Sequence, residues 1–176
     1  MRVNLGNIPL HIFLFLITVF TTLMAGTELV SGKSFFWGPE AERLTFGEIG
    51  QGWQFSFAFL LFLTVHEFGH YLTAVYHRVK CSLPYYIPVF FPFMPMNIGS
   101  FGAVIRIREL PGSRRKYFDI GVAGPLAGFV VAVGLLVYGF ATLPPMEEYV
   151  LNIHPDYVKV FDGVPTMAQM EGKRIP

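Results

Sequence analysis

Residues 53–76 of the chain read WQFSFAFLLFLTVHEFGHYLTAVY. A helix needs roughly 17–25 predominantly apolar residues to cross a bilayer, and this run is that long. Two histidines and a glutamate lie within it, in the sequence HEFGH at residues 66–70. Ionisable side chains cost free energy at membrane depth, so their presence there indicates a functional site. This one segment therefore determines both the fold class and the chemistry that the sequence predicts.

The spacing within residues 66–70 favours a metal site. On an α-helix, residues four apart share one face, so His66 and His70 can both bind one zinc ion while Glu67 stands beside it. The alternative is a pair of buried histidines that bridge neighbouring helices, which leaves the glutamate unexplained. The single cysteine, Cys81, excludes an internal disulfide and a cysteine-based zinc site. We therefore predict Zn²⁺ as the cofactor, bound by the two histidines.

The composition is that of a membrane protein. Of the 176 residues, 53% are hydrophobic and 14% are charged, and the mean hydropathy is +0.49. A soluble domain of this length would be less apolar, so we expect a polytopic protein embedded in a lipid bilayer. The net charge of +1 gives no indication of a nucleic-acid partner.

Three segments are apolar and long enough to span the membrane: approximately residues 8–25, 53–76 and 118–143. The first could instead be a signal peptide, but residues 23–25 (LMA) form a poor cleavage signal, so we expect the segment to be retained. The sequence thus predicts an all-α polytopic membrane protein with about three transmembrane helices. We treat residues 1–176 as a single membrane-embedded domain with an extracytoplasmic tail at 144–176.

The charge distribution predicts an orientation. Residues 77–117 contain seven basic residues and one acidic residue, whereas acidic residues outnumber basic ones in residues 26–52 and 144–176. The positive-inside rule places the basic segment in the cytoplasm and the other two outside. His70 precedes Tyr76 by six residues, or about 9 Å of helix, so the motif lies nearer the cytoplasmic side, submerged but within reach of cytosolic water.

Residues 81–109 join the second and third spans, yet they are too apolar for an exposed loop. Four prolines exclude a regular helix: Pro84, Pro88, Pro92 and Pro95. We expect a re-entrant segment that folds back toward the metal, because irregular backbone at membrane depth needs protein or a wet cavity around it. Residues 100–108 alternate in part and predict a short strand or β-hairpin. Such a strand could hold an extended peptide by edge pairing, or it could be a purely structural hairpin.

The third span begins with closely spaced small residues. Gly124 and Gly128 form a GxxxG pair, and such pairs let another helix approach closely. Pro125 removes one backbone donor and should bend the helix. Two interpretations of this pattern stay open. The small residues could serve helix packing alone, or their face could pack on the helix that carries the zinc motif and line the substrate cleft.

Three motifs in order make the chain similar to a known family. They are HEFGH in a hydrophobic span, a proline-rich segment leading to GSFGA at 99–103, and AGPLAG at 123–128. Over about residues 53–143 the chain resembles the site-2 protease family of intramembrane zinc metalloproteases, particularly its chloroplast and bacterial branch. The resemblance implies that His66 and His70 are zinc ligands, that Glu67 is the catalytic base, and that the substrate is a membrane-anchored protein cut within or near its span. It implies a bacterial inner membrane or the organellar equivalent as the location.

The predicted strand and the small-residue face of the third span make Gly102, Gly124 and Pro125 candidates for the substrate cleft. The resemblance also implies a third zinc ligand, an aspartate of an Asp-Gly pair within a further hydrophobic span. Asp162-Gly163 has this form but lies among charged residues on the predicted outer side, so we interpret Asp162 as a decoy. We expect the chain to be C-terminally incomplete, with the third ligand downstream of Pro176. Without that ligand, the chain by itself should bind zinc weakly or not at all.

Other polar residues have simpler interpretations. Asp119 follows three basic residues at the cytoplasmic entrance of the third span, so we expect an interfacial ion pair with them in preference to a ligand role. We interpret His11 and His154 as ordinary polar residues, since neither has a partner at metal-binding spacing, and His77 as a flank of the basic segment.

The sequence leaves other functions open. The chain could be a non-catalytic relative or fragment that binds membrane helices without cutting them. It could also be a different membrane zinc hydrolase, with a glutamate from a separate helix as third ligand. A metal transporter fits less well, because Glu67 would then have no task.

Overall fold

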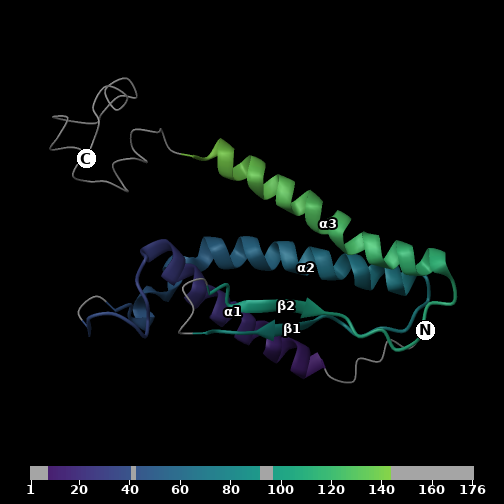
Figure 1. Ribbon diagram of the computed structural model, residues 1–176, viewed down its shortest axis with the longest axis horizontal. Helices are drawn as coiled ribbons and strands as arrows, with labels where there is room; N and C mark the ends of the chain where they lie inside the picture. Colours follow the sequence, from purple (N-terminus) through teal and green to yellow (C-terminus); the bar gives the residue numbers. More distant parts are fainter. Residues whose placement is uncertain (1–7, 41–42, 92–96, 144–176) are drawn as a thin grey trace. The chain divides into compact units, whose positions relative to one another are not determined.

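The computed structural model describes residues 8–40, 43–91 and 97–143. In chain order its elements are helix α1 (Ile8–Ser31), the 3₁₀ helix η2 (Phe46–Gly52), helix α2 (Trp53–Tyr76), strand β1 (Tyr85–Pro88), strand β2 (Ser100–Val104) and helix α3 (Arg114–Ala141) (Figure 1). The protein is mostly helical with one small antiparallel sheet, as the sequence predicts. The packing described below lies within residues up to Leu135, which form one compact unit.

Three helical segments of the described chain are long and apolar enough to cross a membrane: Ile8–Ser31, Phe46–Tyr76 and Arg114–Ala141. Helix α2 has the bounds that the sequence predicts, whereas α1 continues past the predicted end at residue 25. Helix α3 begins earlier than the predicted residue 118 because Ser113 caps it. The Lys116 backbone N–H donates to the Ser113 hydroxyl oxygen at 3.4 Å, so the basic residues form the first helical turn.

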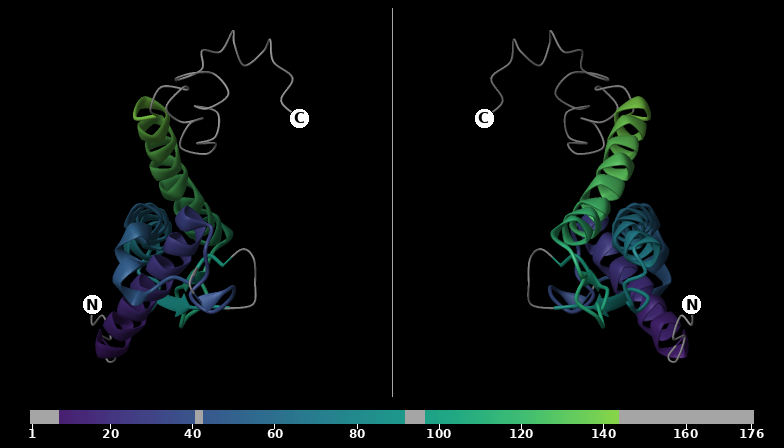
Figure 2. Two further views of the ribbon diagram at one scale, coloured as in Figure 1. Left: turned by 90° about the vertical axis from the view of Figure 1, so that its left-hand side faces the viewer. Right: turned by 90° about the vertical axis from the view of Figure 1, so that its right-hand side faces the viewer.

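Helix α1 packs against α2 and η2 through threonine hydroxyls. The hydroxyl groups of Thr22 on α1 and Ser56 on α2 are hydrogen-bonded at 2.7 Å. Thr27 donates to the Ile49 carbonyl at 2.8 Å and accepts from the Gly52 N–H at 3.1 Å. Figure 2, which looks along α2, shows α1 crossing it at an angle. The sequence analysis did not identify this polar face, which satisfies buried hydroxyls that would otherwise destabilise the contact.

The predicted β-hairpin is present between α2 and α3, but its second strand is shorter than predicted. Strand β2 pairs antiparallel with β1 and ends at Val104, and a single bridge between Cys81 and Ile107 continues the pairing. The ladder is interrupted because the Ser82 side chain intervenes, its hydroxyl oxygen accepting from the Arg106 N–H at 3.0 Å. The predictions for Pro92 and Pro95 lie outside the described residues.

The hairpin is held against both preceding helices. Figure 1 shows it alongside α2, where a small core of buried side chains joins it to that helix: Leu60, Leu63, Tyr86 and Ala103. On the α1 side, the Thr21 hydroxyl donates to the Gly99 carbonyl at 2.6 Å. Gly99 has a φ of 81°, and a side chain there would collide with the α1 backbone. The hairpin therefore packs against both α1 and α2, as irregular backbone between apolar helices requires.

A methyl group at residue 52 should destabilise the α1–η2 contact. A Cβ added to Gly52 would collide with the Leu23 carbonyl oxygen and the Thr27 nitrogen of α1, whereas a Cβ added to Gly50 meets nothing within 4 Å. We expect Gly52→Ala to lower the free energy of unfolding by about 1–3 kcal/mol, the usual cost of overpacking. Unfolding of the purified protein in detergent measures this, with Gly50→Ala as the control. Equal stability of the two variants would contradict the packing.

Candidate metal centre

His66 and His70 lie one turn apart on α2, with their imidazole rings facing each other. Their Nε2 atoms are 3.2 Å apart, and the ring planes meet at 76°. Zinc–nitrogen bonds are about 2.0–2.1 Å long, so tetrahedral coordination separates two ligand nitrogens by about 3.3 Å. The two nitrogens therefore have the separation at which they could share one zinc ion.

The His70 ring is oriented by the backbone of α3. Its Nδ1 atom is hydrogen-bonded to the Ile120 carbonyl oxygen at 2.6 Å. Since a carbonyl oxygen only accepts, Nδ1 carries a proton, which leaves Nε2 as the ring nitrogen that could bind a metal ion. Metal-binding histidines commonly have such a partner on the second nitrogen, which fixes both the tautomer and the ring orientation. This contact spans fifty residues of sequence, and no local pattern indicates it.

Small residues bring α2 and α3 close enough for that contact. A Cβ on Gly69 of the HEFGH motif would lie 2.6 Å from the Ala123 carbonyl oxygen and 3.0 Å from the Gly124 Cα. A Cβ on Gly124 would collide with the His70 ring, and one on Gly128 would lie 3.1 Å from Nδ1 of His66. The GxxxG face of α3 therefore packs on the two histidines. The idea that this face also lines a substrate cleft stays a prediction.

Glu67 lies on a different face of α2, the one directed at the hairpin. Leu60 and Thr64 are seven and three residues earlier on that face, and both contact the hairpin residue Tyr86: Leu60 shares a core cluster with it, and the Thr64 hydroxyl is hydrogen-bonded to its phenol oxygen at 2.8 Å. Glu67 is buried, with 7% of its surface exposed. Within the described residues, no side chain donates a hydrogen bond to its carboxylate. An incoming molecule could therefore use both carboxylate oxygens.

The described residues include no group of three histidine, cysteine, aspartate or glutamate side chains that could bind a metal ion.

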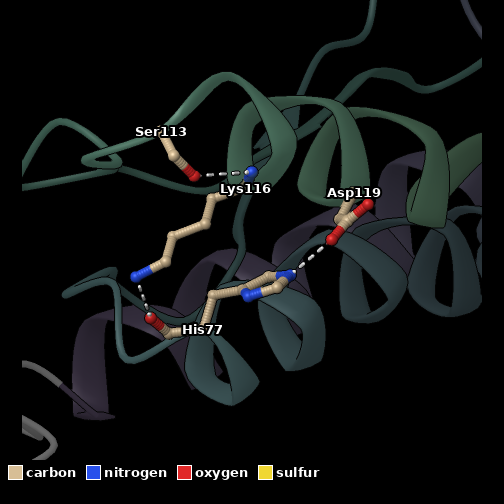
Figure 3. Close-up of polar contacts among 4 residues, drawn as sticks. All are labelled: His77, Ser113, Lys116 and Asp119. Atoms are coloured by element: carbon tan, nitrogen blue, oxygen red, sulfur yellow. Dashed lines mark hydrogen bonds and ion pairs between the residues drawn. The ribbon is translucent and has the colours of Figure 1, made fainter.

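Asp119 is in an ion pair, as predicted, but the predicted partners were wrong. Its Oδ2 atom accepts from Nε2 of His77 on α2 at 2.8 Å (Figure 3). Arg114 and Arg115 are exposed, and the Lys116 amino group donates to the His77 carbonyl at 3.2 Å. Helix α3 approaches α2 through this turn, so a group from α2 lies closer to Asp119 than its own neighbours do.

Of the two histidines interpreted as ordinary polar residues, the structure describes His11 and does not describe His154. His11 on α1 is hydrogen-bonded through Nδ1 to the Pro84 carbonyl oxygen at 3.0 Å, and its ring lies 4.0 Å from the Tyr85 ring. It thus helps to hold the hairpin. His154 and the Asp162-Gly163 pair lie outside the described residues, so the interpretation of Asp162 as a decoy stays a prediction.

A cavity of about 290 Å³ opens beside His70, between the segment that follows β2 and the start of α3. Its wall is mostly apolar and consists of seven residues: His70, Ile105, Ile107, Pro111, Tyr117, Ile120 and Gly121. Pro125 has no N–H, so the Gly121 carbonyl four residues earlier lacks its usual helical donor. The cavity therefore has a mostly apolar wall, and one of its lining residues, Gly121, has a carbonyl without its usual helical donor.

The three predicted cleft residues do not line this cavity. Gly124 is covered by the His70 ring, and Pro125 is exposed on α3. Gly102 lies on β2 with a φ of 99°, and open space surrounds the position that its Cβ would take. Their roles in a substrate cleft stay predictions. Ile105 and Ile107 were visible in the alternating pattern of residues 100–108, but that pattern did not indicate which side of the strand would face the histidines.

Comparison with known proteins identifies a matching family and several similar proteins. The family model described as Peptidase family M50 matches residues 54–172. The chain is 32% identical over 139 residues to the probable zinc metalloprotease EGY2, chloroplastic, of Oryza sativa subsp. indica, an alignment that covers 79% of this chain and 23% of that protein. It is 33% identical over 112 residues to the probable zinc metalloprotease EGY1, chloroplastic, of Arabidopsis thaliana, covering 64% and 18% respectively. The chain thus spans about a quarter or less of these relatives. No solved structure matches it.

A methyl group on Gly124 should displace His70 from its position. We expect Gly124→Ala to weaken zinc binding by the full-length protein at least tenfold, because the ring must leave the Ile120 carbonyl to make room. Gly134→Ala on the same helix is the control, since a Cβ there meets nothing within 4 Å. Zinc affinity is measured by competition with a chelator, and helical content by circular dichroism. Equal zinc affinity in the two variants would show that the close approach does not position His70.

Proposed function

Since the chain belongs to peptidase family M50, we propose that it is the catalytic core of a zinc-dependent intramembrane protease. Its substrates would be membrane-anchored proteins, cut within or near their spans in regulated intramembrane proteolysis. The observation that carries the proposal is the pair of Nε2 atoms 3.2 Å apart, one of them oriented by the Ile120 carbonyl. The names of the relatives, probable zinc metalloproteases, support zinc as the metal.

We propose that His66 and His70 hold the zinc ion and that a residue outside the described part of the chain completes the site. When bound, zinc would supply Lewis acidity that makes water a better nucleophile and polarises the carbonyl to be attacked. The hydrogen bond from Nδ1 of His70 to the Ile120 carbonyl suits this role, because it leaves Nε2 as the nitrogen that would bind the ion, and a ligand nitrogen must be unprotonated.

Glu67 would act as the general base and then as the general acid. Its carboxylate accepts a proton from the attacking water and passes it to the amide nitrogen that leaves, so proton and bond changes balance over the reaction. Burial makes each electrostatic contact of the carboxylate stronger than in water. Because no described side chain occupies its oxygens, Glu67 can turn between the water and the leaving nitrogen.

The proposed setting is a lipid bilayer. Three helices of the described chain have the length and hydropathy of membrane spans, and many of their large apolar side chains are exposed, as on a lipid-facing surface. We propose that residues 1–176 form one membrane-embedded core, with the hairpin as a re-entrant segment. The basic residues between α2 and α3 favour a cytoplasmic location for this end, which places the HEFGH motif nearer the cytoplasmic side.

Two features could bind an extended substrate near the histidines. Strand β2 belongs to a sheet of two strands in the described chain, so its second edge could pair with a peptide strand. The apolar cavity beside His70 could take one apolar side chain of that peptide, and the Gly121 carbonyl could accept a hydrogen bond from its backbone. A transmembrane helix must unwind before its peptide bonds can be cut, and edge pairing would stabilise the unwound form.

Glu67→Gln should abolish cleavage and leave the zinc affinity nearly unchanged, because the amide cannot accept the proton and does not ligate the ion. The measurement uses the full-length protein in lipid vesicles with single-span reporter proteins of varied span sequence, and mass spectrometry of the products. Glu48→Gln in the exposed η2 turn is the control. Cleavage by the Glu67 variant at the control rate would refute this mechanism. Zinc-free, inactive preparations of the unaltered protein would favour a non-catalytic helix-binding relative instead.

Filling the cavity should change the choice of substrate. We expect Ile105→Trp to lower kcat/KM about tenfold for reporters with a large apolar residue beside the cleaved bond, and to spare reporters with alanine there. Leu110→Trp is the control, because Leu110 lies outside β2, is 86% exposed and does not line the cavity. An equal change for both reporters would indicate that the cavity does not bind that side chain.

A further inference from the structure

Two adjacent residues of α3 make polar contacts with two histidines of α2. Ile120 accepts through its carbonyl oxygen from His70, and Asp119 accepts through its carboxylate from His77. His70 and His77 are seven residues apart, which is nearly two turns, so they lie on the same face of α2 and its C-cap. Both contacts therefore lie in the same interface between α2 and α3, which we call the seam. The Asp119–His77 contact is next to the Ile120–His70 contact that orients the ring of the proposed zinc ligand.

Figure 3 shows how His77 is held. Its Nε2–H donates to Oδ2 of Asp119 at 2.8 Å, and its backbone carbonyl accepts from the Lys116 amino group at 3.2 Å. Both side chains of the ion pair are largely covered, with 17% of His77 and 32% of Asp119 exposed. Ser113 caps the turn that carries Lys116 and Asp119. The end of α2 is therefore tied to the first turns of α3 by two contacts of defined direction.

The remainder of the seam consists of small residues and apolar packing, which select the axial position of α3 less strictly than a polar pair does. Gly69 on α2 and Gly124 and Gly128 on α3 let the backbones approach, with the two imidazole rings lying against the α3 glycines. The buried side chains of Ala74 and Ile120 share one cluster near the end of α2. Among the described residues the other ion pair, Lys80 with Glu109, joins the two segments beside the hairpin and does not join the helices. A polar pair in an otherwise apolar helix contact is known to select one register over others.

We propose that Asp119 and His77 are positioning residues of the metal centre. Their pairing fixes the axial position of α3 relative to α2. At that position the Ile120 carbonyl reaches Nδ1 of His70. A shift of α3 along the seam would remove this acceptor, and the His70 ring would lose the constraint that points Nε2 toward His66. This role rests on the proposed function, because it acts through His70 as a zinc ligand.

The test is zinc affinity of the full-length protein in detergent, measured by chelator competition, together with the visible absorption of the cobalt-substituted protein. We expect Asp119→Ala to weaken zinc binding about tenfold, the lower end of the effect of removing an outer partner of a ligand, and to alter the cobalt spectrum. Asp119→Asn should retain the affinity, since its amide oxygen still accepts from His77. Glu109→Gln, which breaks the exposed ion pair beside the hairpin, is the matched control and should change neither quantity.

His77→Ala and the double variant His77→Ala/Asp119→Ala supply the second measurement. If the two residues act as one unit, the double variant loses no more zinc affinity than either single variant. Losses that add, or an Asp119→Ala protein that binds zinc as tightly as the Glu109→Gln control, would overturn the positioning role alone. A lack of zinc in the unaltered protein would overturn the proposed function and this inference with it, so the two failures are distinguishable.

Discussion

The close approach of α2 and α3 is the constraint on which the rest of the site depends. Where Gly69 meets Ala123 and Gly124, no side chain separates the two backbones. Only at this distance can a backbone carbonyl of α3 reach the His70 ring, and the glycine face of α3 then closes over both imidazoles. Small residues in apolar helices are usually explained by packing, and here the same packing orients a candidate ligand.

Polar groups within apolar helices require partners, and this structure provides them through contacts between elements. Threonine hydroxyls of α1 bond to α2, to the turn before it and to the hairpin. The ring nitrogens of His70 and His77 use α3 as a partner. Glu67 differs, because it is buried and no described side chain donates to it. A buried carboxylate to which no side chain donates a hydrogen bond costs free energy, which fits the role of general base proposed for Glu67.

The fold was largely predictable, because its main signals are local. The apolar run at 53–76 is the observed helix α2, and the prolines at 84 and 88 excluded a helix where the hairpin lies. The end of α1 and the start of α3 were misplaced, since a capping serine and the packing of the helix ends determine them. The partner of Asp119 was also wrong, because it is His77 at the end of α2, while Arg114 and Arg115 are exposed and Lys116 donates to the His77 carbonyl.

The amino-acid sequence by itself determined which residues share a helical face. Four-residue spacing puts His66 and His70 together, and the same spacing makes a flat strip of Gly124 and Gly128. Which partners those faces meet was decided by the tertiary structure alone: the Ile120 carbonyl on His70, His77 on Asp119, and the threonines of α1 on the hairpin. The physical reason is that periodicity is a property of a few neighbouring residues. The axial position of one helix relative to another depends on all the contacts between them. The residues that make these contacts are some fifty residues apart in the chain.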